Sequence, residues 1–424
     1  MDEKIIPIGG LNVHIIHTDK YKTNTLVLKM KAPLTRETVT RRALLPYVLQ
    51  SGTKSYPFTS SLRSYLDELY GASLNVDLTK KGEYHIITIR IDIANERFLQ
   101  DTTPLLKKAI ELLSEIVHEP ATENHMFLSK IVEQEKRALK QRIQAACDDK
   151  MRYANMRLVE EMYAGEPYAL HANGVLEDVD AITADDLYEY YKKSLLEDEV
   201  DLYVIGDVNE SEVVEMAKSY FRFESRTTLS SSQTTNKKSI SKVNTVVEQQ
   251  DVKQGKLNIG YRTNITYDSD KYYALQVFNG IFGGFAHSKL FLNVREKASL
   301  AYYAASRLES HQGLLMVMSG IEPGNYEKAV NIINEQMEAM KNGQFTDGEI
   351  EQTKAVIHNQ LLETLDTPRG LVEVLYHNVV SNRSRSIAEW LEAIEAVTRD
   401  EIVSVGKDIE LDTIYFLTGM EAEQ

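Results

Sequence analysis

Cysteine is almost absent from this chain, because Cys147 is the only one among 424 residues. A single thiol excludes an intramolecular disulfide and a zinc site built from four thiolates. Cys147 falls in the helical stretch Gln144-Ala145-Ala146-Cys147. We expect a plain buried thiol there rather than a nucleophile.

Long apolar runs are also missing. No stretch approaches the roughly 18 apolar residues that a membrane-spanning helix needs, so no membrane span is expected. The chain begins Met1-Asp2-Glu3-Lys4 and continues with strand-like residues, without the basic and apolar regions of a secretory signal. These two absences predict a cytoplasmic location.

Positive charge is scarce, since 48 Lys and Arg residues stand against 63 Asp and Glu residues. The net charge of −15 argues against nucleic acid as a partner, because phosphate binding requires clustered basic side chains. The acidity serves solubility and is compatible with cationic peptides as ligands. The length predicts two to three domains.

Recognisable metal and nucleotide motifs are lacking as well. No two of the ten histidines are four residues apart, the spacing that places two ligands on one helical face. His14 and His17 are three apart on a predicted strand and should point to opposite faces. The sequence has no P-loop, G-x-G-x-x-G or G-x-S-x-G motif. The glycine pair Gly283-Gly284 is expected at a helix end or a tight turn.

What the chain does contain is an internal repeat. Short matches recur in the same order in both halves, and their collinearity indicates two diverged copies of one unit. The paired segments are 72–74 with 298–300, 133–136 with 351–354, 181–185 with 396–400, and 204–206 with 417–419. In the third pair, Thr183 and Thr398 each precede an acidic residue, as an N-cap residue does at the start of a helix.

The predicted element order gives each copy an α+β fold. In the first copy we expect strands over 25–31, 73–77 and 84–91 and helices over 40–50, 62–70 and 105–117, and the second copy mirrors this order from Lys256 onward. Residues 225–241 are rich in Ser, Thr, Lys and Gln, which is typical of a linker. We therefore predict an N-terminal domain over 1–222, a linker over 223–242 and a C-terminal domain over 243–424.

One segment suggests chemistry. In residues 292–303, Arg295 is predicted to end a helix and Tyr302 to begin a strand. A guanidinium and a phenol can together donate hydrogen bonds to a carbonyl or an oxyanion. The simpler interpretation is an arginine favoured by the helix dipole beside an ordinary strand tyrosine.

Over essentially its whole length, the sequence resembles the inverzincin peptidases, the family of pitrilysin, insulin-degrading enzyme and the mitochondrial processing peptidase. The resemblance lies in SGT at 51–53, LYGASLN at 69–75, GEPY at 165–168 with Gly174, VIGDV at 204–208, and SKLF at 288–291 through VREK at 294–297 to LAY at 300–302. It implies two homologous α/β-sandwich domains, each a mainly antiparallel sheet with helices on one face. Together they would form half of a clam-shaped dimer.

The family's zinc motif, H-x-x-E-H, is missing from the place where the resemblance puts it. Counting back from Gly52 and Thr53, its three functional positions hold Ala43, Pro46 and Tyr47. The third zinc ligand of the family would fall at Arg142, seven residues after Glu135. These side chains cannot hold zinc or activate water, and Pro46 is expected to bend or break its helix.

The resemblance therefore implies a member of a noncatalytic branch. In relatives that work as two chains, one chain brings zinc and the other brings an Arg/Tyr pair, whose positions Arg295 and Tyr302 occupy here. We expect no cofactor in this chain and zinc only in a sibling subunit. The expected partners are that zinc-bearing peptidase in a heterodimer, or a second copy in a homodimer, and a peptide held in an internal chamber.

Two other hypotheses stay open. The first is a structural or peptide-binding scaffold with no role in proteolysis, because the family includes such members among the core subunits of a respiratory complex. The second is a peptidase with another metal site or a nucleophile, for which Ser, Thr and Cys147 offer no clear constellation.

Overall fold

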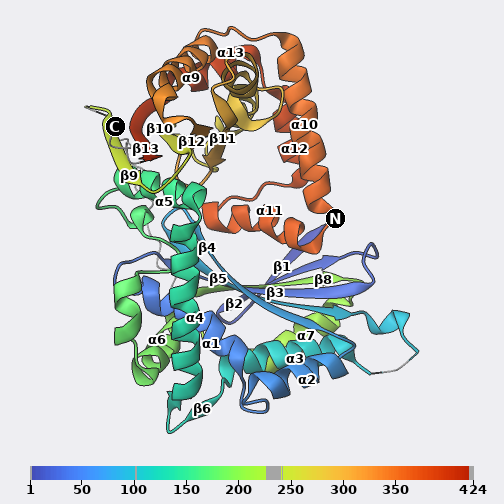
Figure 1. Cartoon of the computed structure of the whole chain (residues 1–424). Coiled ribbons are helices and arrows are strands. Elements are labelled where there is room, and N and C mark those ends of the chain that lie inside the picture. The colour runs from blue at the N-terminus through green and yellow to red at the C-terminus, as the bar shows by residue number, and fades with distance from the viewer. Residues whose placement is uncertain (1, 101–102, 226–239, 241, 420–424) are drawn as a thin grey trace. The chain divides into compact units, whose positions relative to one another are not determined.

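The computed structural model describes residues 2–100, 103–225, 240 and 242–419 (Figure 1). The chain forms two compact units, one made of Met1–Ala145 and Leu170–Ser232 and the other of Ala146–Ala169 and Gln233–Gln424. Residues 226–239 and 241 of the predicted linker lie outside the described residues. Among the described residues, no helix combines the length and the apolar character that crossing a membrane requires.

The first unit is built on a six-stranded sheet in the order β1-β2-β8-β3-β5-β4. Only the pair of β2 and β8 is parallel. A separate two-stranded ribbon pairs β6 with β7. The strands are β1 (Glu3–Ile8), β2 (Leu11–His17), β3 (Thr23–Pro33), β4 (Ser73–Lys81), β5 (Tyr84–Ala94), β6 (Thr122–Glu123), β7 (Met126–Phe127) and β8 (Glu199–Gly206).

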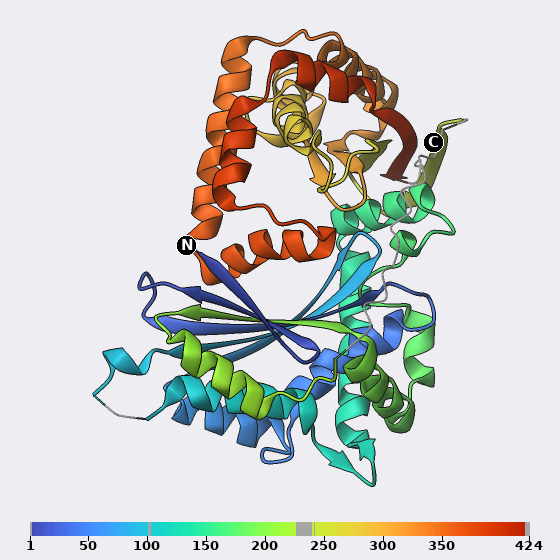
Figure 2. The same cartoon turned by 180° about the vertical axis from the view of Figure 1, so that it is seen from behind.

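Helices cover one face of this sheet (Figure 2). Alternate strand residues such as Val13, Leu28, Ile89 and Leu202 face that layer and form the apolar core with it. The helices are α1 (Val39–Ser51), α2 (Thr59–Glu68), α3 (Leu105–His118), α4 (Ser129–Asp148), α6 (Ala184–Glu197) and α7 (Glu210–Tyr220), with short 3₁₀ turns η1 (Glu96–Phe98) and η3 (Leu176–Ala181).

The second unit has a five-stranded sheet in the order β11-β12-β10-β13-β9, in which only the pair of β13 and β9 is parallel. Its strands are β9 (Asn244–Gln250), β10 (Gly255–Arg262), β11 (Ala301–Glu309), β12 (Leu314–Ile321) and β13 (Glu410–Gly419). Its helices are α5 (Lys150–Met162), α8 (Tyr272–Asn279), α9 (Tyr326–Lys341), α10 (Asp347–Leu365), α11 (Pro368–Ser381), α12 (Ile387–Ala396) and α13 (Arg399–Lys407), with 3₁₀ turns η2 (Pro167–Ala169) and η6 (Pro323–Asn325) and π-helical turns η4 (Gly280–Gly284) and η5 (Phe291–Lys297).

Helix α5 explains why residues 146–169 belong with the second unit. Its side chains Leu158 and Met162 form a small core with Met316 of β12 and Tyr415 of β13. Helices α8, α9 and α13 pack against the other face of that sheet, with Leu257 and Val317. The predicted domains were contiguous along the chain, whereas this helix precedes all the strands that it covers.

The two units repeat one topology. The strand order β2-β8-β3-β5-β4 matches β9-β13-β10-β12-β11, including the one parallel pair in each sheet. The repeat extends to side chains: Lys136 Nζ donates to the carbonyl oxygen of Asp180 at 3.1 Å, and Lys354 Nζ donates to that of Glu395 at 2.7 Å. The structure confirms the predicted α+β fold of two homologous sheet-and-helix domains.

A fully buried arginine joins helix α1 to its surroundings. The guanidinium of Arg42 donates to the carbonyl oxygens of Met30 at 2.7 Å and His85 at 3.1 Å, to Tyr190 Oη at 3.2 Å, and to Asp198 Oδ2 at 2.6 Å. Its side chain is 0% exposed. Strands β3 and β5, helix α6 and the start of β8 are therefore tied to one turn of α1.

A second buried ion pair lies near the opposite edge of the same sheet. His14 contacts Glu3 Oε1 through Nδ1 at 2.7 Å and Asp201 Oδ1 through Nε2 at 3.1 Å, and its ring stacks on Tyr203. Burial alone would lower the pKa of His14, but the hydrogen bonds to Asp201 and Glu3 outweigh it and raise the pKa from 6.5 to about 9. His17, on the opposite face as predicted, is exposed.

Arg42→Met is expected to lower the free energy of unfolding by about 3–5 kcal/mol, because Asp198 keeps its buried charge and loses its cation. Urea denaturation at pH 7 measures this. The neighbouring Arg41 pairs with Asp186 at 2.8 Å in a partly exposed position, so Arg41→Met should cost less than about 1 kcal/mol. Equal losses for the two variants would contradict the role given to Arg42.

The raised pKa of His14 predicts a stability that depends on pH. A folded-state pKa above the unfolded value means that the contribution is fully present below pH 6.5 and is lost as pH rises through about 9. The loss should reach about 3 kcal/mol. Urea midpoints between pH 6 and 10 should therefore fall, and His14→Gln should remove this part of the fall. His17→Gln, on the same strand, should retain it. A parallel fall in His14→Gln would refute the prediction.

Candidate functional site

The positions that would carry the zinc motif lie on α1 in the first unit. Ala43 and Pro46 are both buried. Helix α1 runs from Val39 to Ser51 with Pro46 inside it, so the expected break does not occur. Proline removes one hydrogen bond of the helix, but buried Leu45 and Leu49 on either side hold the helix against the core.

The structure brings Tyr47 and Arg142 together. The guanidinium carbon of Arg142, on α4, lies 3.5 Å from the ring centroid of Tyr47. A cation on an aromatic face is stabilising by about 0.5–2 kcal/mol. Burial lowers the pKa of Arg142 and raises that of Tyr47. Two nitrogens of Arg142, Nε and Nη2, are buried without a hydrogen-bond partner among the described residues.

Glu135 lies two helical turns before Arg142 on α4. Its Oε1 accepts a hydrogen bond from Ser51 Oγ at 3.1 Å, and its side chain is buried. With Tyr47 and Gln50 it lines a small cavity of about 310 Å³. Among the described residues that line this cavity, Glu135 is the one carboxylate.

These residues do not fit a zinc ion. Zinc in proteins takes three or four ligands from Cys, His, Asp and Glu, whereas Ala43 and Pro46 have no donor atom and Arg142 brings a positive charge. Among the described residues, no group of three or more His, Cys, Asp or Glu side chains could hold a metal.

The second unit presents Arg295 and Tyr302 at the surface. Arg295 lies in the π-helical turn η5, and its side chain is 43% exposed. Its guanidinium lies 4.6 Å from the centroid of the Phe291 ring and 3.7 Å from the carboxylate of Glu296. Tyr302 is the second residue of strand β11 and is 66% exposed. Turn η5 packs against β11, which brings these two segments together.

A β-bulge sets the direction of Tyr302. The register shifts between Ala301, which pairs with Ile321, and Tyr303, which pairs with Gly320, so Tyr302 is the extra residue. Bulges aim a side chain out of the regular alternation and are frequent beside active sites. The neighbouring ring of Tyr303 lies over Gly320, where a Cβ atom would approach within 2.4 Å of it. The backbone of β11 at the bulge thus sets the outward direction of the Tyr302 phenol.

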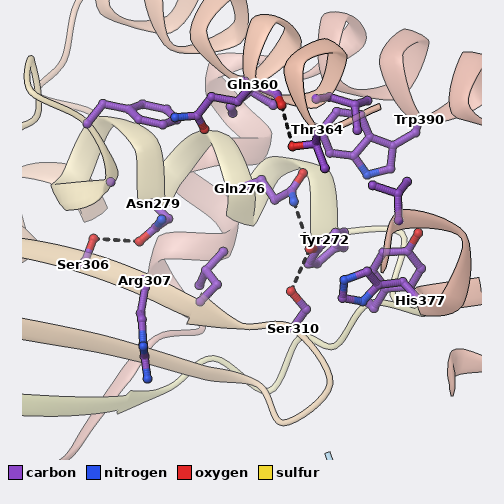
Figure 3. Close-up of a pocket in the computed structure, with 17 residues that line it drawn as sticks. Tyr272, Gln276, Asn279, Ser306, Arg307, Ser310, Gln360, Thr364, His377 and Trp390 are labelled. Carbon is purple, nitrogen blue, oxygen red and sulfur yellow. Dashed lines mark hydrogen bonds between the residues drawn. The ribbon is translucent and has the colours of Figure 1, made fainter. Parts of the chain in front are cut away.

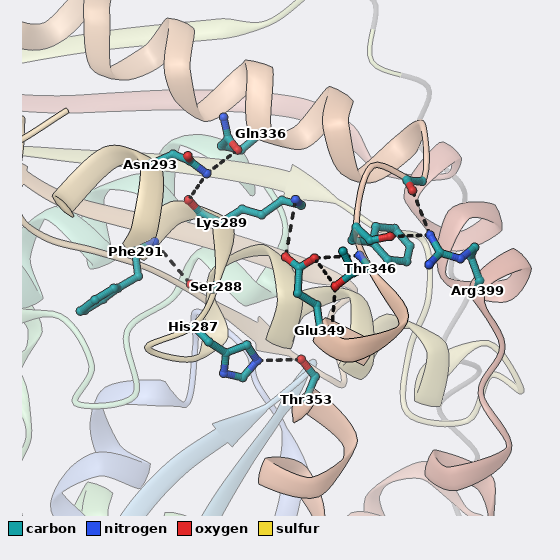
Figure 4. Close-up of polar contacts among 12 residues, drawn as sticks. His287, Ser288, Lys289, Phe291, Asn293, Gln336, Thr346, Glu349, Thr353 and Arg399 are labelled. Atoms are coloured by element: carbon teal, nitrogen blue, oxygen red, sulfur yellow. Dashed lines mark hydrogen bonds and ion pairs between the residues drawn. The ribbon is translucent and has the colours of Figure 1, made fainter. Parts of the chain in front are cut away.

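Polar contacts fasten the segment around η5 to two helices (Figure 4). Asn293 Nδ2 donates to Gln336 Oε1 of α9 at 2.8 Å. Lys289 Nζ lies 3.7 Å from Glu349 Oε1 of α10. These anchors could not be predicted from the sequence, because their partners are more than forty residues away along the chain and no spacing marks them.

His287 adds a third anchor to α10. Its Nε2 lies 2.9 Å from Thr353 Oγ1, and burial lowers the pKa of His287. The neutral ring therefore predominates at pH 7. No other histidine lies near His287 in the sequence, so its contact with α10 could not be predicted.

The chain matches known proteins along its whole length. Residues 181–357 match the family model described as the Peptidase M16 inactive domain. The chain is 58% identical over 413 residues to a "Probable inactive metalloprotease YmfF" of Bacillus subtilis, with 97% of each chain covered. It is 23% identical over 326 residues to the mitochondrial-processing peptidase subunit beta of Saccharomyces cerevisiae, covering 72% of this chain and 68% of that protein.

A solved structure shares the fold closely. The crystal structure of a conserved protein from Enterococcus faecalis V583 has a TM-score of 0.93 and 36% identity, and the comparison covers 100% of both chains. The resemblance seen in the sequence is confirmed. With a match of this identity and extent, and with no zinc ligands at the motif positions, the chain belongs to the M16 peptidase family, in its noncatalytic, YmfF-like branch.

Proposed function

We propose that this chain is a noncatalytic subunit of a zinc-peptidase assembly, to which it lends Arg295 and Tyr302. The observation that carries the proposal is the exposed phenol of Tyr302, which a β-bulge turns outward beside the anchored turn of Arg295. The loss of ligands at Ala43, Pro46, Tyr47 and Arg142 supports a division of labour in which a sibling subunit holds the zinc.

The chemistry of the pair suits this role. A guanidinium offers N–H donors in a fixed plane and a phenol offers one O–H donor. Aimed at the carbonyl oxygen of a peptide bond, both would bind the substrate and stabilise the negative charge that develops during attack. The name of the yeast relative, a subunit of a processing peptidase, supports an assembly of this kind.

The sheet edges support peptide capture. Within its own sheet, β11 is a terminal strand, and β4 is terminal in the first unit. A terminal strand offers backbone N–H and C=O groups to an extended peptide, which can add to the sheet as a further strand. A peptide bound along β11 would run beside Tyr302. The strand that binds the peptide would therefore also carry a residue that acts on it.

The first prediction concerns the chain by itself. Purified without a sibling and dialysed against micromolar zinc, it should retain well under one zinc per chain by elemental analysis, because the ligands are absent. It should also leave fluorogenic peptides uncut. A sibling subunit with an intact H-x-x-E-H motif is the positive control for zinc, and that sibling combined with this chain is the positive control for hydrolysis. Hydrolysis by the single chain that a chelator abolishes would refute the proposal.

The second prediction concerns the reconstituted pair. Arg295→Ala and Tyr302→Phe should each lower kcat by about 10²–10³, as expected when one donor to a developing oxyanion is removed. Zinc content and co-purification with the sibling should be unchanged. Tyr303→Phe is the matched control, because its hydroxyl is buried and makes no hydrogen bond among the described residues. Full activity in both test variants would instead favour a scaffold without a role in proteolysis.

A further inference from the structure

A second cavity lies in the second unit, lined by α8, β11 and helices α10, α11 and α12 (Figure 3). Its volume is about 450 Å³, within the range of pockets that hold small ligands. All of its lining residues belong to the second unit. Neither Arg295 nor Tyr302 lines it, so the proposed function makes no use of this space.

Aromatic residues form part of the wall of the cavity, and the lining carries little charge. Tyr272, Phe285, His377 and Trp390 present rings to it, and no carboxylate is among the described residues that line it. The guanidinium of Arg307 lies 3.4 Å from the carboxylate of Glu309, and Figure 3 shows it directed away from Gln276 and Trp390. Flat rings without a counter-charge favour a planar, neutral occupant.

Among the residues that line the cavity, one polar group lacks a partner. Gln276 Nε2 donates to Tyr272 Oη at 2.9 Å, and Tyr272 Oη lies 2.8 Å from Ser310 Oγ. The other end of the carboxamide, Gln276 Oε1, is buried and makes no hydrogen bond among the described residues. Turning the carboxamide over would leave its nitrogen without a partner instead. A buried polar atom left in this state is destabilising, and a ligand that supplies the missing hydrogen bond would remove that cost.

We propose that this cavity binds a neutral, planar group with an amide edge, in which N–H and C=O stand side by side. Such an edge satisfies the carboxamide of Gln276 in either orientation, and the flat group lies against Trp390. Two sources have this chemistry: a free heterocyclic carboxamide or lactam, and the carboxamide of a peptide side chain or terminus. The inference is independent of the proposed function, because it involves no sibling subunit and no peptidase activity.

The chain supplies its own reporter, because Trp390 is the only tryptophan in the sequence. We would titrate the full chain with nicotinamide for the heterocyclic source and with N-acetylphenylalanine amide for the peptide source. Tryptophan emission, corrected for absorption by the probe, and shielding of Trp390 from acrylamide report occupancy. Calorimetry gives the Kd. Benzoate, which has a similar ring and a negative charge, should bind at least ten-fold more weakly than the better amide.

Gln276→Met removes the amide and keeps the size of the side chain. It should weaken binding about 3- to 10-fold, the usual effect of losing one neutral hydrogen bond. Gln352→Met, on the exposed face of α10, is the matched control and should bind as the unchanged chain does. Circular dichroism and urea midpoints check that both variants fold.

Binding of either amide with these differences supports the proposal, and the tighter probe identifies the source. The proposal is overturned if neither amide binds at millimolar concentration. It is also overturned if Gln276→Met binds as tightly as the unchanged chain, or if benzoate binds as tightly as the amides. None of these results bears on Arg295 and Tyr302, so the two proposals fail separately.

Discussion

The buried guanidinium of Arg42 is the interaction on which the geometry of the first unit depends. Its hydrogen bonds to Met30, His85, Tyr190 and Asp198 fix both the position of α1 and its rotation about its own axis. Because residues on a helix turn together, this anchor decides where the next turn points. The ring of Tyr47 then faces α4 and meets Arg142. The positions at which the sequence comparison predicts the zinc motif therefore lie on a helix whose Tyr47 is covered by the guanidinium of Arg142.

The second unit shares this topology, but α8, the helix that follows β10 as α1 follows β3, contains no arginine. Its α8 continues into a π-helical turn, and a second π-helical turn precedes β11. Such turns place extra residues in a helix and occur often at functional sites. Here the two π-helical turns are followed by the β-bulge in β11, where the phenol of Tyr302 is exposed. The two copies of one fold have therefore specialised differently, one towards a closed core and the other towards an open surface.

Much of this architecture could be predicted from the sequence. Residue patterns located α1, α3, β3 and β5 closely. The N-cap residues Thr183 and Thr398 marked the starts of α6 and α13. Three features could not be predicted, for different physical reasons. The placement of α5 depends on a sheet made later in the chain. The bulge at Tyr302 depends on the pairing register with β12. The cavity beside Gln276 is enclosed by five elements that are close only in the folded unit.

Helix α5 has a consequence for how the chain comes to fold during its synthesis. It leaves the ribosome roughly 250 residues before β13, the last strand on which it packs, has been made. At about 5–20 residues per second, its apolar face waits for about 12–50 seconds. Over that interval Leu158 and Met162 have no sheet to cover. The chain order thus separates the synthesis of this helix from the burial of its apolar face, which follows only when the second sheet has formed.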